Sequence, residues 1–278
     1  MLKKFIYCLI SVLIFTSALN AQDSTNASNF ISIEYGIHHL SDQDLILSPF
    51  ILKDLSGANI SLTYKRYARL AQWVEISFDA FDPTYPEPYN YYTNPDSTIE
   101  ETINNDFTFV RLNYGIGKTL RSSEKCAWTV GGMVENTVMA KYYYAGYFST
   151  FGYFASFGLS AWSQFGYAFD NKNSASVSMH FPLMAWVCRS PYLANDDMFI
   201  ENTESHKGVK TFFAYVNDGN LQTVNKLQQF NLKLDYIYKI NPKFSVGATY
   251  QFSILHNNTP VNLTSIQNGL NIKATYNF

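Results

Sequence analysis

Residues 270–278 at the C-terminal end of the chain alternate strictly between apolar and polar side chains. Leucine, isoleucine, alanine, tyrosine and phenylalanine occupy every second position, and asparagine, lysine and threonine lie between them. Successive side chains of a β-strand point to opposite faces of the sheet. This segment therefore predicts a strand with one apolar face and one polar face, which ends on the aromatic ring of Phe278.

This pattern resembles the C-terminal strand of Gram-negative outer-membrane β-barrels. The resemblance implies that the protein resides in the cell outer membrane, with lipid around it. It also implies that Tyr276 and Phe278 form the assembly signal that the barrel-assembly machinery reads. The resemblance does not extend to a specific functional family, so it leaves the molecular task open.

Residues 1–21 resemble a secretory signal peptide, with Lys3 and Lys4 ahead of an apolar run at 5–15. Cleavage is expected after Ala21, with cleavage after Ala18 as the alternative. A membrane-anchoring helix is the other reading, but the apolar run is short for a span of about 20 residues. The mature chain is therefore expected to be a single barrel over 22–278.

Composition agrees with a barrel. No other stretch approaches the roughly 18 consecutive apolar residues that indicate a membrane-spanning helix. The chain contains 21 tyrosines and 22 phenylalanines, which suit the aromatic girdles at both interfaces of an outer-membrane barrel. The formal net charge of -2 gives no indication of a nucleic-acid partner.

Alternation and turn signals predict an all-β fold, a transmembrane antiparallel up-and-down β-barrel of about ten strands. Twelve strands are the alternative, if 198–201 and 209–216 form a further pair. A soluble β-sandwich is the other fold considered. The ten expected strands are 29–38, 58–67, 72–81, 107–120, 126–143, 153–169, 173–188, 227–240, 243–255 and 266–278.

The connections between these strands alternate in length, as in barrels with short periplasmic turns and long extracellular loops. A soluble β-sandwich does not require that alternation. The short connections are 68–71, 121–125, 170–172 and 241–242. The longer ones are 39–57, 82–106, 144–152, 189–226 and 256–265.

The strand phase assigns an outer face to lipid. Two polar residues fall on that face: Asn136, where a β-bulge is expected, and Arg66, which is expected near the periplasmic rim. The apolar residues expected to meet lipid are Ile31, Ile33, Tyr35, Ile37, Ile60, Leu62, Tyr64, Val74, Ile76, Phe78, Val110, Leu112, Tyr114, Ile116, Phe230, Leu232, Leu234, Tyr236, Tyr238, Phe244, Val246, Ala248, Tyr250 and Phe252.

The opposite phase predicts a lumen with balanced charge. Charges removed from bulk water must be paired or stay hydrated, so an ion-paired interior is expected. Open channels appear near 16 strands, so ten strands predict a closed or nearly closed barrel. Glu34 and Lys273 are expected to meet where the first strand pairs with the last. The candidate lumen ion-pair residues are Glu34, Lys65, Glu75, Asp79, Arg111, Glu135, Lys141, Lys233, Asp235 and Lys273.

One constellation could suggest a serine hydrolase, because Ser176, Ser178 and His180 share one strand face. Outer-membrane phospholipases carry the order His-x-Ser, whereas this chain has the reverse order and no identifiable orienting residue nearby. His38 and His39 are adjacent on a strand and point oppositely, so they cannot chelate one metal together. No catalytic, metal or cofactor site is predicted.

A second constellation would be an acid pair with a histidine, as in ten-stranded outer-membrane proteases. Asp79 and Asp82 are three residues apart and cannot share a strand face. Asp196, Asp197 and His206 lie in the longest loop, with no spacing that predicts a geometry. Proteolysis is therefore not expected.

The loops offer a different role. Loop 82–106 is rich in proline, tyrosine and asparagine, a composition typical of binding surfaces. Loop 189–226 is too long for a simple connection, and a short helix over the mouth is expected at 193–204. The predicted function is a non-enzymatic barrel that displays loops to an extracellular ligand or scaffolds an envelope protein complex. A small-solute channel is the alternative, and an outer-membrane hydrolase the third.

Two cysteines remain after cleavage of the signal peptide. Cys126 is expected at the periplasmic end of its strand and Cys188 near the extracellular end of another. A hydrocarbon core of about 30 Å would separate them, whereas a disulfide needs Cα atoms within about 7 Å. Two free thiols are therefore predicted.

Overall fold

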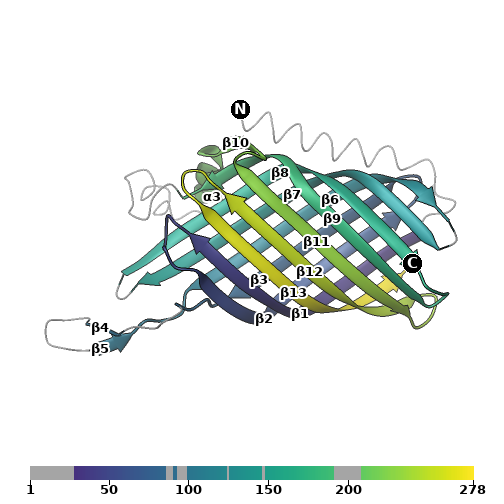
Figure 1. Ribbon diagram of the computed structural model, residues 1–278, viewed down its shortest axis with the longest axis horizontal. Coiled ribbons are helices and arrows are strands. Elements are labelled where there is room, and N and C mark those ends of the chain that lie inside the picture. The colour runs from purple at the N-terminus through teal and green to yellow at the C-terminus, as the bar shows by residue number, and fades with distance from the viewer. Residues whose placement is uncertain (1–27, 86–89, 93–98, 124, 146–147, 191–207) are drawn as a thin grey trace.

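A computed structural model describes residues 28–85, 90–92, 99–123, 125–145, 148–190 and 208–278 (Figure 1). Ten antiparallel strands close into a barrel, which confirms the predicted fold class. The barrel strands are β1 (Ser28–Asp44), β2 (Leu52–Tyr67), β3 (Ala71–Phe81), β6 (Asp106–Ser122), β7 (Cys126–Ala145), β8 (Phe148–Ala168), β9 (Asn173–Arg189), β11 (Leu227–Lys239), β12 (Phe244–Asn257) and β13 (Leu263–Asn277).

Closure of the barrel depends on the pairing of the first strand with the last. β1 pairs with β13 without interruption from Phe30 opposite Asn277 to Asp44 opposite Leu263. Every other barrel strand pairs with its neighbours in chain order, and β8 pairs with β9. This pairing leaves neither the first nor the last strand as a free edge, and closure of this kind allows a β-structure to cross a membrane.

Within the described residues, four short elements lie outside the ten barrel strands. They are the hairpin of β4 (Asn90–Tyr92) and β5 (Ile99–Glu101), the helix α3 (Gly208–Asn217) and β10 (Asn220–Thr223). The twelve-strand alternative is wrong, because 209–216 lies within α3 and does not form a barrel strand. The other segment of that alternative, 198–201, and the helix expected at 193–204 lie outside the described residues.

The two ends of the barrel differ. One end, here the turn end, carries the C-terminus and the four short connections 68–70, 123–125, 169–172 and 240–243 (Figure 1). The opposite end, here the loop end, carries the other connections and the projecting β4–β5 hairpin. Four of these connections are longer, as predicted, but β7 and β8 are joined by only two residues, so the longer connection expected at 144–152 is wrong. The turns are locally stabilised: Asp170 accepts hydrogen bonds from the backbone N–H groups of Lys172 and Asn173 at 2.7 Å each.

Asp170 also accepts a hydrogen bond from the side-chain amide of Asn173 at 2.8 Å. That side-chain bond, together with the two backbone donors, holds the pKa of Asp170 below its ordinary value. The aspartate therefore stays ionised in this exposed turn, where its oxygens replace the ladder partners that the turn lacks.

Several strands extend further toward the loop end than the sequence predicted. β1 continues to Asp44 instead of ending at 38, and β7 and β8 occupy nearly all of the expected loop 144–152. β7 and β8 have 20 and 21 residues, about twice the roughly 9–11 that a membrane strand needs. The prediction failed there because Tyr153 and Phe154 are aromatic on opposite faces of β8, which hides the alternation.

The bulge expected at Asn136 is also a wrong prediction. The β6–β7 register runs unbroken through Leu112 opposite Asn136, and it shifts only between Thr119 and Arg121. Asn136 is accommodated on the outer face because its side-chain amide donates to the carbonyl oxygen of Leu112 at 2.8 Å. Arg66 lies opposite Asn29, near the turn end, and is half-buried.

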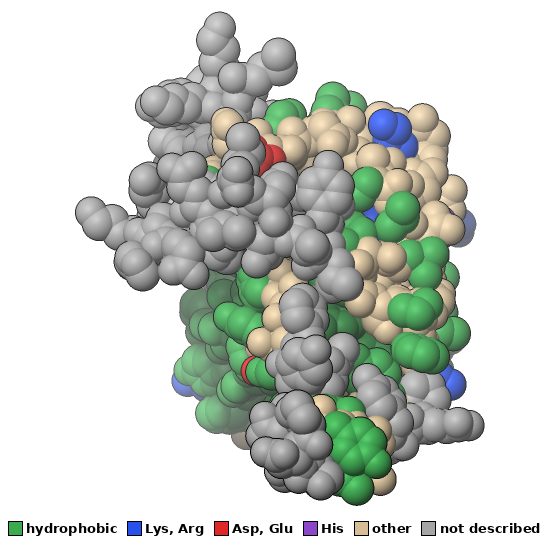
Figure 2. Space-filling view, turned by 90° about the vertical axis from the view of Figure 1, so that its left-hand side faces the viewer, with side chains coloured by type: hydrophobic (Ala, Val, Ile, Leu, Met, Phe, Trp, Pro, Cys, Tyr) green, Lys and Arg blue, Asp and Glu red, His purple; other side chains and the backbone are tan. Residues whose placement is uncertain are grey.

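The outer face of the barrel is an apolar band, as predicted. Side chains such as Ile33, Leu62 and Ile272 are 49%, 49% and 76% exposed, although they are hydrophobic. Figure 2, which views the molecule from the loop end, shows such side chains gathered on its flank. An apolar outside, a polar inside and an even number of antiparallel strands are the architecture of an outer-membrane β-barrel.

Among the described residues, no helix has the length and apolarity needed to cross a membrane.

The two cysteines are free, as predicted. Cys126 begins β7 at the turn end, and Cys188 is the penultimate residue of β9 at the loop end. The thiol of Cys188 is buried and donates to the carbonyl oxygen of Val216 at 3.4 Å. It therefore helps to hold α3 against the barrel wall.

The C-terminal ring is separable from barrel stability. Phe278 is 59% exposed, and its backbone N–H donates to the carbonyl of Asn29 at 3.0 Å. Deletion of Phe278 is expected to lower insertion into the outer membrane without altering export, because little buried area is lost. Heat-modifiable gel mobility of membrane fractions measures folded protein. Phe244→Ala, which removes another half-exposed turn-end ring, is the control and should insert normally. Unchanged insertion after the deletion would contradict an assembly signal at Phe278.

Candidate functional site

The inward side chains of β1 line the lumen from one end to the other. Residues two apart on a strand share a face, and β1 places Ser32, Glu34, His38, Leu40 and Asp42 inward in that order. Each side chain lies in a different environment: an open vestibule, an ion cluster, a polar layer, an apolar layer and a second ion cluster. The lumen is therefore filled in layers.

The vestibule opens at the turn end and has a volume of about 350 Å³. Its described lining includes Lys65, Lys125, Lys239 and Lys273 and contains no aspartate or glutamate. Phe30, Tyr67 and Tyr167 supply aromatic surface there.

The lower ion cluster lies next to the vestibule on the side of the loop end; 'lower' here means nearer the turn end. It is defined as Glu34, Lys65, Glu75, Lys233, Asp235 and Lys273. Lys273 Nζ lies 2.9 Å from Glu34 Oε1 and 2.8 Å from Asp235 Oδ1. Lys233 Nζ lies 3.0 Å from Glu34 Oε2 and 2.8 Å from Glu75 Oε2. Lys65 Nζ lies 3.8 Å from Asp235 Oδ2. The three bases therefore match the three acids in one connected network.

Hydrogen bonds from neutral side chains complete this network. Thr249 donates to Asp235 at 2.7 Å, Thr63 donates to Glu75 at 3.2 Å, and Gln251 donates to Glu34 at 3.2 Å. A buried carboxylate needs such partners, because Coulomb attraction alone does not offset the loss of hydration. The side chains of Glu34, Asp235 and Lys273 are 0%, 2% and 2% exposed, so this requirement is strict.

The polar layer contains an aspartate with three partners. Asp79 Oδ2 accepts from Arg111 Nη1 at 2.5 Å, and Asp79 Oδ1 lies 3.0 Å from His38 Nδ1. Asn59 donates to the same carboxylate. Arg111 also donates to Gln267 on the opposite side of the barrel, so this layer spans the lumen.

The His38 ring has its place because of a glycine. A Cβ atom at Gly269 would collide with the ring carbons and Nε2 of His38. The ring uses that space to contact Asn271, whose Oδ1 lies 3.1 Å from Nε2. His39, the next residue, is half-buried on the other face of β1, as the alternation requires.

His180 faces a carboxylate that the sequence did not indicate. Its Nε2 lies 3.4 Å from Glu135 Oε1, and the same glutamate accepts hydrogen bonds from Ser160 at 2.8 Å and Gln229 at 2.5 Å. Glu135 is on β7 and His180 on β9, with β8 between them, so only the folded barrel brings them together. The signal available in the sequence was their shared inward phase.

The candidate hydrolase residues are separated in the structure. Ser176 donates to Asp235 at 3.5 Å, and Ser178 is buried; among the described contacts no hydrogen bond joins either serine to His180. The cavity beside His180 has a volume of about 50 Å³ and is lined mainly by polar side chains. Asp82 lies in the exposed connection after β3, whereas Asp196, Asp197 and His206 lie outside the described residues.

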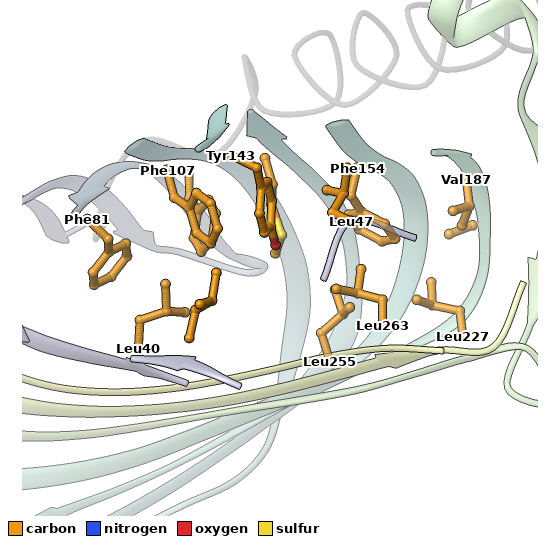
Figure 3. Close-up of a cluster of buried hydrophobic side chains, with 14 of the residues drawn as sticks. Leu40, Leu47, Phe81, Phe107, Tyr143, Phe154, Val187, Leu227, Leu255 and Leu263 are labelled. Atoms are coloured by element: carbon orange, nitrogen blue, oxygen red, sulfur yellow. The ribbon is translucent and has the colours of Figure 1, made fainter. Parts of the chain in front are cut away.

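A hydrophobic plug fills the lumen toward the loop end. Leu40, Phe81, Phe107 and Tyr143 are each at most 2% exposed, although they project into the barrel interior. Figure 3 shows the labelled side chains facing one another across the lumen. The plug is defined as Leu40, Leu47, Leu52, Phe81, Tyr85, Phe107, Phe109, Met139, Tyr143, Phe154, Ala185, Val187, Leu227, Leu255 and Leu263.

The connection between β1 and β2 supplies one member of the plug. Leu47 turns into the barrel against Gly152, where a Cβ atom would collide with its methyl groups. The turn that directs it is fixed by Asp44, whose backbone oxygen accepts from the N–H groups of Leu47 and Ser48 at 2.9 and 2.8 Å.

The upper ion cluster, Asp42, Asp44, Lys141 and Arg189, lies beside the plug. Lys141 Nζ is 2.6 Å from Asp42 Oδ2, and Arg189 Nη2 is 2.6 Å from Asp44 Oδ1. Lys141 also lies 5.4 Å from the Phe107 ring centroid, a cation–π distance. The sequence analysis missed three of these residues because it ended the two strands at 38 and 188.

All ten candidate lumen residues lie in the barrel interior, and each contacts an oppositely charged or polar partner. Six form the lower ion cluster, Asp79 pairs with Arg111, Lys141 belongs to the upper cluster, and Glu135 faces His180. Tyr276 and Phe278 lie at the turn end, with ring centroids 6.0 Å apart. In the part of the chain that the structure describes, no group of three or more His, Cys, Asp or Glu is arranged to hold a metal ion.

The loop after β3 is anchored at its base and projects at its tip. Asn105 donates to the carbonyl of Pro83 at 2.9 Å, and Tyr85 inserts into the plug while its hydroxyl donates to the carbonyl of Tyr144 at 3.0 Å. The β4–β5 hairpin extends beyond the barrel (Figure 1), where Tyr92 and Ile99 are 66% and 57% exposed.

The second long loop takes a different course. α3 packs against the outer side of the wall: Trp186 donates to the carbonyl of Val216 at 2.8 Å, and the rings of Tyr153 and Tyr215 stack at 4.2 Å. Phe212 and Phe213 are 38% and 50% exposed. The described part of this loop therefore covers the flank of β8 and β9 and leaves the lumen to be closed by the plug.

No protein-family model matches the chain. No curated protein matches it significantly. Similar solved structures include Ail, the attachment invasion locus protein of Yersinia pestis, with 11% identity over 91% of this chain and 100% of that chain and a TM-score of 0.30. The translocator domain of the autotransporter NalP from Neisseria meningitidis has 7% identity, coverages of 99% and 96%, and a TM-score of 0.42.

A third similar structure is an outer membrane channel from Pseudomonas putida F1. It has 12% identity, covers 93% of this chain and 98% of that chain, and has a TM-score of 0.40. At these identities and TM-scores the similarities go no further than the barrel fold. The functional argument therefore rests on the lumen and the loops of this chain.

Glu34→Ala and Lys273→Ala test whether the lower ion cluster is dry. The two residues are directly opposite in the β1–β13 register. Each substitution is expected to cost about 3–5 kcal/mol, because it leaves an uncompensated buried charge. The double variant should lose less than the sum of the two, measured by urea unfolding from lipid vesicles.

A neutral seam pair provides the control for this cycle. Ser32 Oγ and Thr275 Oγ1 lie 2.8 Å apart on the same two strands, and their substitution by alanine should cost only about 0.5–1.5 kcal/mol. If Glu34→Ala and Lys273→Ala instead gave additive effects of about 0–1 kcal/mol, the lumen would be hydrated.

Proposed function

We propose that this protein is a closed, non-enzymatic outer-membrane barrel that presents the loop 82–105, and above all its β4–β5 hairpin, to a binding partner outside the cell. The observation that carries this proposal is the hairpin itself, which projects past the barrel with exposed tyrosine and isoleucine side chains. An extracellular ligand or another protein of the envelope would serve as the partner. Export through the N-terminal 21 residues and recognition of Tyr276 and Phe278 by the assembly machinery belong to the same proposal.

The chemistry of the hairpin indicates the kind of partner. Tyr92 lies opposite Ile99, and Tyr91 lies opposite Glu100 and donates to its carboxylate at 3.2 Å. Exposed tyrosine beside an aliphatic side chain is typical of residues that dominate binding energy. Glu100 and Glu101 add negative charge, so a partner with an apolar contact patch and basic or hydrogen-bonding groups around it fits best.

The rigid base supports the same role. A binding loop gains affinity when it is held in place before the partner arrives, because less conformational entropy is lost on binding. Both ends of this loop are fixed to Tyr144 of β7, because Asn105 accepts from its N–H at 2.9 Å and Tyr85 donates to its carbonyl at 3.0 Å. The Lys53–Thr84 bridge joins the loop to the neighbouring strand β2. The lower part of the loop is thus ordered by the same plug that fills the lumen.

The filled lumen argues against the small-solute channel. A solute that crossed the barrel would have to pass two ion clusters and an apolar layer in which Phe107, Phe154 and Leu263 are fully buried. A hydrolase is also unsupported. His180 and Glu135 lie on the turn-end side of the plug, and no described hydrogen bond joins Ser178 to His180.

Removal of the hairpin side chains is expected to abolish partner binding. The variant Tyr92→Ser/Ile99→Ser loses two apolar contacts worth about 1.5–3 kcal/mol each when buried, which corresponds to more than about tenfold in affinity. Cells that express the wild type or the variant at equal surface levels are tested on immobilised glycans and extracellular-matrix proteins. Val261→Ser, an exposed apolar residue of another loop-end connection, is the control. Equal binding by all three proteins would contradict the proposal.

Single-channel recording separates the display role from the channel. The purified barrel in planar bilayers is expected to give no steady conductance, because the ion clusters and the plug occupy its lumen. The Tyr92→Ser/Ile99→Ser variant should be equally silent, since the hairpin lies outside the lumen. A porin reconstituted in the same bilayers controls for insertion. Steady openings of the wild-type barrel would favour the channel alternative over a closed lumen.

A further inference from the structure

The wall of the barrel is interrupted between β9 and β11. These strands pair from Asn173 opposite Tyr238 up to His180 opposite Asn231, where the pairing stops. Nearer the loop end, β9 pairs with β10 instead of β11, beginning with Met184 opposite Thr223. Three residues of β9, 181–183, therefore lie opposite seven residues, 224–230, with no ladder between them.

The sequence explains where the break falls. Pro182 has no backbone N–H, so it cannot donate to a ladder in the middle of a sheet. Beside it the β8–β9 register shifts, because Leu159 lies opposite Met184 while Ser160 lies opposite Pro182. On the other side of the break the chain makes a turn, in which Lys226 N–H donates to the carbonyl of Thr223 at 2.9 Å.

A groove of about 270 Å³ lies at this break. Its walls are formed by outward side chains, Phe181, Phe230 and Ile254, and its floor by the inward residues Leu227 and Gln229.

Gln229 closes the floor toward the lumen, because its side-chain amide donates to Glu135 at 2.5 Å. The groove therefore penetrates the wall from the outside without opening into the polar layer.

We propose that this groove binds the hydrocarbon chain of a membrane lipid, which enters sideways from the bilayer. The groove is continuous with the apolar outer band, since Met179 and Leu183 beside it are 40% and 49% exposed. None of its described lining residues is an aspartate, glutamate, lysine or arginine. An apolar cavity of about 150 Å³ already admits benzene, so the groove has room for a segment of an acyl chain.

The polar residues at the groove favour one orientation of the lipid. Gln228 and His256 are opposite each other in the β11–β12 register, two positions nearer the loop end than Phe230 and Ile254. A lipid headgroup would meet these polar side chains, and its chain would point toward the middle of the band. An added β-strand is a poorer occupant, because Pro182 removes a donor from the edge that such a strand would use.

Photolabelling with a phosphatidylglycerol that carries a diazirine midway along one acyl chain tests the proposal. The full mature barrel is reconstituted with this lipid, irradiated, digested and mapped by mass spectrometry. Adducts are expected on the floor residues Leu227 and Gln229 as well as on the exposed band residue Ile272. Leu255, which is inward-facing on the neighbouring strand β12 and 2% exposed, should carry none.

Two tryptophan variants make the result specific. Val224→Trp fills the groove at its margin, where Val224 is 55% exposed, and should reduce adducts on Leu227 and Gln229 severalfold while Ile272 stays labelled. Val261→Trp adds the same ring to the β12–β13 connection outside the groove and should change neither.

Three outcomes would overturn the proposal. The first is labelling confined to outward residues and insensitive to Val224→Trp. The second is equal labelling of Leu255, because the probe would then reach the interior by another route. If a second copy of the chain covered the groove, chemical crosslinking would show a dimer that Val224→Trp weakens, with floor labelling absent. That result would also reject the lipid.

Discussion

Ionised side chains that leave bulk water must find partners, and in this barrel they find them across the lumen. Lys233 on β11 contacts Glu75 on β3, and Lys141 on β7 contacts Asp42 on β1. Each of these contacts joins strands that are several positions apart around the barrel. The pairs therefore join distant strands across the lumen as well as satisfying the charges, and the plug fills the space beside them. The closed lumen and the anchored loop base follow from this arrangement, and the proposed display role depends on both.

The period of two in the sequence was enough to predict the strands, their faces and the ten inward charges. It could not predict which charges meet, because contacts such as Glu135 with His180 depend on how far the strands are staggered around the closed barrel. It also failed where both faces of a strand are apolar, as at the loop end of β8, where Tyr153 points outward and Phe154 points inward. The segment 209–216 was considered as a strand, but its apolar residues at 209, 212, 213 and 216 have the spacing of a helix face, and it folds as α3 against Trp186. Local pattern cannot reveal such tertiary packing.

The two longest loops take different courses. The loop after β3 is fixed by Asn105 and Tyr85 and carries its exposed side chains away from the membrane. The described part of the loop after β9 returns along the outer wall as α3 and β10, where Phe212 and Phe213 face outward. The break between β9 and β11 follows immediately, so one continuous segment shapes the side of the barrel that departs most from a regular wall.

The uninterrupted β1–β13 seam has a consequence for the order of assembly. β1 contributes a side chain to every layer of the lumen, but the partner Lys273 belongs to the last strand of the chain. Until β13 arrives, Glu34 lacks one of its two lysines and Asp235 lacks its nearest one, and these charges would be exposed to the interior of an open sheet. A sheet that lacks β13 is therefore destabilised electrostatically relative to the closed barrel. The final pairing of β13 with β1 removes that penalty, so the lower ion cluster favours the complete barrel over an open sheet.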